Sequence, residues 1–176
     1  MKLSKIGDIV LRYLILVLVA FPNLWIFYLI FTPLTIYPIY FILKLFFDVS
    51  LMSNFIVINK ILTVEIISAC IAGAAYYFLL VLNLSTPKID FKHRASIIIF
   101  SFTTLLILNI FRILILILIA RGGTSFFDLT HEIFWYGLST VFVIVIWFSS
   151  VRIFRVKEIP FYSDLKYLYK KSHLND

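Results

Sequence analysis

Only 14% of the 176 residues are charged and 62% are hydrophobic, so the chain has too few polar side chains to cover the surface of a water-soluble protein. Typical soluble domains are about 45–50% apolar and ~25% charged. The formal net charge of +7 is compatible with nucleic-acid binding, but the basic residues flank apolar segments, which is typical of an integral membrane protein. We therefore expect residues 1–176 to form a single integral membrane domain that contacts no nucleic acid.

The apolar segments predict an all-α membrane protein, a compact bundle of about four transmembrane helices. The stretch from Tyr13 to Leu43 has no charge and exceeds the ~20 residues that one crossing needs. Pro33 and Pro38 interrupt this stretch, so we place the first span at residues 9–31. The other spans are predicted at residues 69–84, 95–120 and 131–151, and residues 152–176 are predicted to be a cytoplasmic tail.

The segment 33–67 is predicted to lie on the external side. Residues 33–47 have the mixture of apolar, aromatic and charged side chains of a helix in the membrane interface, and a short further span is the alternative. Residues 54–67 are rich in β-branched side chains around Asn59-Lys60, which predicts a β-hairpin with a tight turn. An open hairpin cannot face lipid, so it must lie at a surface or against protein.

The positions of the basic residues predict the orientation. With both termini and the 85–94 loop in the cytoplasm, twelve of the sixteen Lys and Arg residues are cytoplasmic: Lys2, Lys5, Arg12, Lys88, Lys92, Arg94, Arg152, Arg155, Lys157, Lys166, Lys170 and Lys171. A separate crossing by residues 33–47 would place the N-terminus, or the basic loop and tail, outside. We therefore expect a multi-pass protein of the cell (cytoplasmic) membrane in which residues 33–47 do not cross.

Three reactive side chains are predicted to meet near the external face. Cys70 begins the second span, and His131 begins the last one. Arg112 comes 17 residues after Ala95, which places it about 25 Å up a core roughly 30 Å thick. Each has a simpler interpretation: Cys70 as a small buried apolar residue, Arg112 extending to lipid headgroups, and His131 flanking a helix start.

These groups permit acyl transfer. The Cys70 thiolate would attack an amide carbonyl, His131 would move protons, and Arg112 would stabilise the oxyanion. Asn109 lies three residues before Arg112 on the same helix face and could orient its guanidinium. The carboxylates nearby, Glu65, Asp128 and Glu132, could hold a base or could be wetted interface charges, and we favour the second role. We expect no metal and no cofactor.

The residues that carry this chemistry occur in three motifs: Ala69-Cys70-Ile71-Ala72-Gly73, Asn109-Ile110-Phe111-Arg112, and His131 with Gly137 after it. Their order and spacing resemble the exosortase/archaeosortase family of membrane cysteine transpeptidases. Arg94 resembles a further basic position of that family. Many members have Cys-Ser-Gly, whereas here two residues separate Cys70 from Gly73.

The resemblance implies a substrate and a reaction. The substrate would be a secreted protein with a C-terminal tripartite sorting signal: a short motif, a transmembrane helix and a basic cluster. The enzyme would cleave near the external face and transfer the acyl group to an acceptor amine on a lipid. Separately, a free edge of the predicted hairpin would be able to pair with an extended substrate segment. The alternatives are a hydrolytic cysteine protease, and a non-enzymatic membrane assembly or transport module in which Arg112 binds lipid phosphate.

Overall fold

The computed structural model describes residues 5–122 and 139–172, which are mostly helical. The elements in order are α1 (Lys5–Ala20), α2 (Trp25–Lys44), β1 (Val49–Met52), β2 (Phe55–Ile58), β3 (Leu62–Glu65), α3 (Ser68–Ile71), α4 (Gly73–Leu84), α5 (Phe91–Arg121), α7 (Ser139–Ile153) and α8 (Tyr162–Ser172). Within these ranges, α2 and α5 are the two helices long and apolar enough to cross a membrane.

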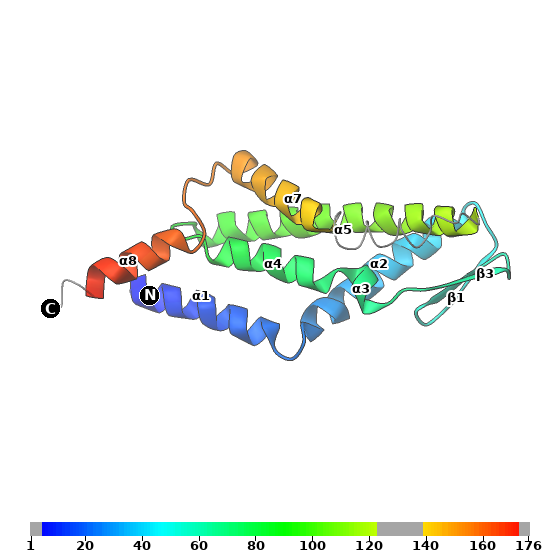
Figure 1. Ribbon diagram of the computed structural model, residues 1–176, viewed down its shortest axis with the longest axis horizontal. Helices are drawn as coiled ribbons and strands as arrows, with labels where there is room; N and C mark the ends of the chain where they lie inside the picture. The colour runs from blue at the N-terminus through cyan, green and yellow to red at the C-terminus, as the bar shows by residue number, and fades with distance from the viewer. Residues whose placement is uncertain (1–4, 123–138, 173–176) are drawn as a thin grey trace.

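The molecule is elongated (Figure 1). The start of α1, the connection between α4 and α5, and α8 lie at one end, while the sheet lies at the other. Helices α1 and α2 lead from the first end toward the sheet, α3 and α4 return, α5 leads out again, and α7 returns. This arrangement places α3, which contains Cys70, and the C-terminal half of α5 toward the sheet.

The expected helix boundary at residues 31–33 is wrong. The break comes earlier, at residues 21–24, where Pro22 cannot donate a helical hydrogen bond and Asn23 and Leu24 have positive φ angles of 50° and 58°. Helix α2 then continues through Pro33 and Pro38 to Lys44. The span expected at residues 9–31 is therefore two helices, and the separate interfacial helix expected at residues 33–47 is the second half of α2.

Burial explains why α2 tolerates its two internal prolines. A proline inside a helix costs about 3 kcal/mol because it removes a hydrogen bond and crowds the preceding turn. Ile36, Ile39 and Leu43 are buried in the core on this part of α2, so packing against the neighbouring elements offsets that cost. The sequence pattern alone did not reveal this compensation, because it depends on what the helix packs against.

The expected hairpin at residues 54–67 is present as β2 and β3, which pair in antiparallel register with Phe55 opposite Glu65. Its turn includes Asn59 and Lys60, as expected, with φ angles of 51° and 57°. An additional strand, β1, precedes the hairpin and pairs with β2, so the sheet has three strands in the order β1-β2-β3. The Asn59 amide donates to the Asp48 carbonyl oxygen at 2.7 Å and closes this end of the β1–β2 ladder.

The expected helix at residues 69–84 is broken next to its cysteine. Helix α3 is one turn long and ends before Ala72, which has a φ of 60°, and α4 starts at Gly73. A Cβ atom on Gly73 would lie 2.8 Å from the Tyr28 ring, so only glycine allows α2 to approach this closely. Cys70 therefore lies on a short turn between the sheet and α4, not on the first turn of a long helix. We call this turn, residues 68–72, the cysteine turn.

An aromatic cluster holds α2, α4 and α5 together. The rings of Phe31 and Tyr76 stack with centroids 3.6 Å apart, and Phe102 meets Tyr76 edge to face at 5.5 Å. Phe27 packs against the same group. Because these rings are contributed by three helices, the cluster sets the position of α5 relative to the start of α4.

The last two predicted segments agree with the structure where it describes them. Helix α5 contains the whole of residues 95–120 and starts four residues earlier, at Phe91. Helix α7 contains the second part of the span expected at residues 131–151, whose first eight residues lie outside the described ranges. The tail contains helix α8, with its acidic residue Asp164 in the first turn.

Candidate active site around Cys70

A cavity of about 130 Å³ lies where β3, α3 and α5 meet. It is large enough for a few water molecules or one small side chain. Its polar groups come from Glu65, Cys70 and Arg112, and Val64, Ile113 and Ile117 are among its apolar walls. The cavity thus brings a thiol, a guanidinium group and a carboxylate into one largely apolar enclosure.

Arg112 is held from two sides. Its side chain is buried, with the residue 6% exposed. One terminal nitrogen, Nη1, donates to Oγ of Ser139 on α7 at 2.6 Å, and the other, Nη2, donates to the Cys70 carbonyl oxygen at 3.4 Å. Two directed contacts on a planar guanidinium group restrict its orientation, so Arg112 is fixed between α7 and the cysteine turn.

Asn109 holds the cysteine turn more tightly than Arg112 does. Its Nδ2 donates to the Cys70 carbonyl oxygen at 2.8 Å, and the residue is 2% exposed. A helix that ends after one turn leaves its last carbonyl groups without intrahelical partners. Asn109 and Arg112, three residues apart on one face of α5, supply those donors for Cys70.

The sequence analysis placed Asn109 and Arg112 on one helix face, with Asn109 expected to orient the guanidinium and Arg112 expected to stabilise the oxyanion. In the structure both residues donate to the Cys70 backbone carbonyl, and Arg112 also donates to Ser139. The thiol lines the same cavity as the guanidinium group. Cys70 does not lie at the N-terminus of a long helix, because α3 has only four residues.

Gly73 and Arg94, which the sequence motifs and the resemblance single out as supporting residues, both have structural contacts. Gly73 lies beside the site and permits the close packing of Tyr28. Arg94 lies 18 residues before Arg112 on α5, about 27 Å away along the helix. Its guanidinium donates to the carbonyl groups of Asn83 and Thr86, so it satisfies the end of α4 and does not belong to the Cys70 cavity.

The third predicted catalytic residue, His131, lies outside the described residues, as do Asp128, Glu132 and Gly137. Ser139 is a site residue that the sequence analysis missed. A single serine at the edge of an apolar segment has many possible partners, and only the packing of α7 against α5 pairs it with Arg112. Glu65 was expected to be a wetted interface charge, and it is exposed and also lines the cavity.

The opposite end of the molecule carries a separate group of ionic contacts. Arg12 is 4% exposed, and its guanidinium donates to the Leu84 carbonyl at 2.7 Å and contacts the carboxylates of Asp8 at 3.0 Å and Asp164 at 3.1 Å. These bonds join α1, the end of α4 and α8. Lys88 contacts Glu158 at 2.6 Å, and this hydrogen bond lowers the pKa of the Glu158 carboxyl group.

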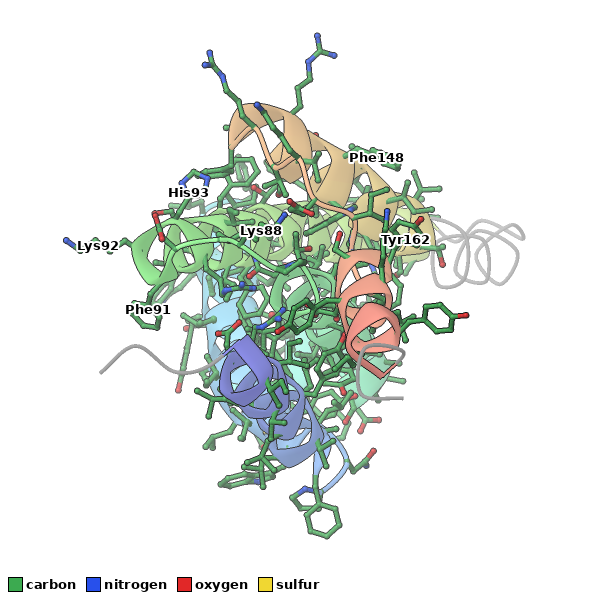
Figure 2. All side chains as sticks on the ribbon, turned by 90° about the vertical axis from the view of Figure 1, so that its left-hand side faces the viewer. Lys88, Phe91, Lys92, His93, Phe148 and Tyr162 are labelled. Atoms are coloured by element: carbon green, nitrogen blue, oxygen red, sulfur yellow. The ribbon has the colours of Figure 1, made fainter. Side chains whose placement is uncertain are left out.

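Basic and aromatic side chains project from this end (Figure 2). Lys92 points outward from the start of α5, with Phe91 beside it and Lys88 nearer the centre. Phe91 is 85% exposed. Exposed aromatic and basic residues together are typical of the boundary between lipid and water.

No family model, curated protein or solved structure matches the chain. The fold and the site therefore define the class: a mostly helical protein with a small sheet, with two helices in its described part that are long and apolar enough to cross a membrane. Membership of the exosortase/archaeosortase family remains a prediction based on the three sequence motifs.

Proposed function

We propose that this chain is a multi-pass membrane cysteine transpeptidase that processes C-terminal sorting signals of secreted proteins. One observation supports this most: the Cys70 thiol and the Arg112 guanidinium line one cavity, although they are 42 residues apart in the sequence. A buried guanidinium group beside a thiol is the pairing that nucleophilic attack with oxyanion stabilisation needs.

The proposed topology has four crossings. Helices α1 and α2 together form the first, α3 with α4 the second, α5 the third, and the segment that contains α7 the fourth. Because residues 33–44 continue the helix that starts at Trp25, they add no crossing of their own. The basic end carries the 85–94 loop and α8, and the positive-inside rule supports a cytoplasmic location for this end and an external location for the sheet and Cys70.

The proposed reaction has two steps: formation of a thioester on Cys70, and transfer of the acyl group from this thioester to an amine. His131 takes the thiol proton, the Cys70 sulfur bonds to the substrate's carbonyl carbon, and Arg112 stabilises the negatively charged oxygen. The C–N bond then breaks, and the leaving amine takes the proton from His131, which leaves a thioester. An acceptor amine then attacks the thioester and loses a proton to His131. The C–S bond breaks as the new amide forms, and the Cys70 sulfur takes the proton from His131, which restores the thiol.

A second candidate function follows from a different observation. Asn109 and Arg112 both donate to the backbone carbonyl of Cys70, and such contacts would also suit a purely structural turn. In this case the chain is a non-enzymatic assembly or transport module, and binding of lipid phosphate by Arg112 requires its guanidinium to leave its contacts with Ser139 and Cys70. A hydrolytic protease is the third candidate, which differs from the first only in using water as the acceptor.

The deciding experiment uses a secreted reporter that ends in a three-part tail taken from a protein of the same organism. We expect Cys70→Ala to abolish cleavage of this reporter while the abundance of the variant remains normal. Ser96→Ala, an exposed change near the opposite end of α5, is the matched control. Unchanged cleavage by Cys70→Ala would rule out both enzymatic functions.

The mass of the reporter's new C-terminus separates transfer from hydrolysis. Transfer adds the mass of an amine joined through an amide, whereas hydrolysis leaves a free carboxylate. Because Cys70 is the only cysteine in the chain, a thiol-reactive probe labels this site alone, and the Cys70→Ala variant is the blank.

A further inference from the structure

Strand β3 is an edge of the sheet. The strand order is β1-β2-β3, so β3 has β2 on one side and, within the described residues, no strand on the other. An exposed edge strand presents backbone N–H and C=O groups that can pair with another extended chain. Thr63 and Glu65 on this strand are both exposed.

The register shows which backbone groups face outward. The Ile66 amide donates to the Asn54 carbonyl at 2.9 Å, directly after the ladder that pairs Glu65 with Phe55. Hydrogen-bonded pairs alternate along an antiparallel ladder, so Val64 and Leu62 also bond to β2. The backbone groups of the intervening residues, Thr63 and Glu65, therefore point away from β2, toward the free edge.

We propose that the substrate segment just before the scissile bond binds to this edge as a fourth strand. This inference rests on the proposed function and adds how the substrate is held. The edge leads directly into the site, because Val64 and Glu65 line the cavity that contains Cys70. Main-chain pairing recognises an extended peptide whatever its side chains, and the adjacent cavity selects one of them.

The direction of pairing follows from the two chain paths. Strand β3 runs from the far end of the sheet toward α3, that is, toward the helical part of the molecule. A substrate whose sorting motif precedes its transmembrane helix also runs from the external side toward the membrane. The substrate strand is therefore parallel to β3, and its C-terminal end reaches the cysteine turn.

The size of the cavity limits the side chain beside the scissile bond. A volume of about 130 Å³ with mainly apolar walls favours a small or medium apolar side chain. In a strand, successive side chains point to opposite faces, so only every second substrate residue can face the cavity. The motif is therefore expected to be selective at alternate positions.

The first test changes the edge of the protein. Thr63→Pro removes the outward N–H group but leaves both β2-facing neighbours unchanged, whereas Thr63→Val keeps the N–H group and removes only the hydroxyl. We expect Thr63→Pro to slow reporter cleavage at least fivefold, about the effect of one lost hydrogen bond, and Thr63→Val to cleave normally. Normal cleavage by a folded Thr63→Pro variant would overturn the inference.

The second test leaves the protein unchanged, so it does not depend on how the proline variant folds. Single prolines are placed at successive positions of the reporter segment before the cleavage site. In a parallel pair, only alternate substrate residues direct their N–H and C=O groups to β3, so cleavage should fall at every second position. Equal sensitivity at all positions, or none at any, would overturn edge pairing.

The two proposals fail in different ways. If cleavage depends on Cys70 but shows neither the Thr63→Pro defect nor the alternating pattern, the proposed pairing of the substrate with β3 is wrong. The proposed transpeptidase function is then unaffected. Reporter that is never cleaved by the wild-type protein overturns both.

Discussion

At the residue scale, the Cys70 site is built from contacts to a backbone carbonyl. The short helix α3 ends at Ile71, and the donors that its carbonyl groups lack come from Asn109 and Arg112 on α5. A buried guanidinium group is costly unless its donors are directed at acceptors, and Ser139 supplies one of them. The site is thus a small polar network inside an apolar bundle.

Ser139 is predicted to position Arg112. Ser139→Ala removes a 2.6 Å hydrogen bond to a charged group, and such bonds contribute about 1.5–3 kcal/mol. We expect reporter cleavage to slow by roughly tenfold or more, because a mispositioned guanidinium stabilises the oxyanion less well.

Initial cleavage rates on equal amounts of protein provide the measurement. Ser139→Thr keeps the hydroxyl and is the conservative control, which should restore most of the rate. If Ser139→Ala and the wild-type protein cleave equally fast, Ser139 has no positioning role.

At the element scale, close packing between α2 and the start of α4 depends on Gly73. The neighbouring Ala72 adopts a left-handed conformation that breaks the helix, so the two residues together shape the cysteine turn. The contact is made by the first turn of α2, because Tyr28 lies three residues after Trp25 and before Pro33.

Gly73→Ala is predicted to destabilise the protein. The new Cβ would lie 2.8 Å from the Tyr28 ring, and overpacking of this kind costs about 1–3 kcal/mol. We expect the free energy of unfolding to fall by about 1 kcal/mol, near the low end of this range, because the Tyr28 ring can move. Thermal unfolding in detergent measures the effect.

A double-mutant comparison tests the cause. Tyr28→Leu removes the ring, so Gly73→Ala should cost less in that background. Ala72→Gly is expected to act in the opposite direction, since glycine adopts the left-handed conformation without steric cost. An equal cost of Gly73→Ala in both backgrounds would show that the Tyr28 contact is not responsible.

At the scale of the whole molecule, the two ends differ in charge and in structure. One end joins α1, α4 and α8 through buried contacts of Arg12 and carries the basic 85–94 loop. The other end carries the sheet and the Cys70 cavity. If the bundle crosses a membrane, the two ends face different compartments, which allows a direct test.

The proposed topology predicts which positions a membrane-impermeant maleimide reaches in intact cells. In a Cys70→Ser background, Lys60→Cys at the hairpin turn should be labelled from outside, whereas Lys92→Cys at the start of α5 should be labelled only after the membrane is permeabilised. Both residues are exposed, so accessibility to solvent does not distinguish them. Labelling of Lys92→Cys in intact cells would contradict the orientation.

Composition and local pattern were sufficient for the helical class, the β2–β3 hairpin with its turn at Asn59, and the common helix face of Asn109 and Arg112. These features depend on hydropathy, turn preference and helix periodicity, which act over a few neighbouring residues. The same reasoning placed the cysteine at the end of a strand-like segment, where β3 leads into α3.

Only the tertiary structure determined where helices end and which groups meet. Pro33 and Pro38 lie inside a helix because burial offsets their cost, while the break at residues 21–24 combines a proline with two positive-φ residues. Arg94 resembled a site residue, but it caps α4 at the opposite end of α5. The pairing of Arg112 with Ser139 and with the Cys70 carbonyl depends on contacts between segments far apart in the chain, and no local preference encodes such contacts.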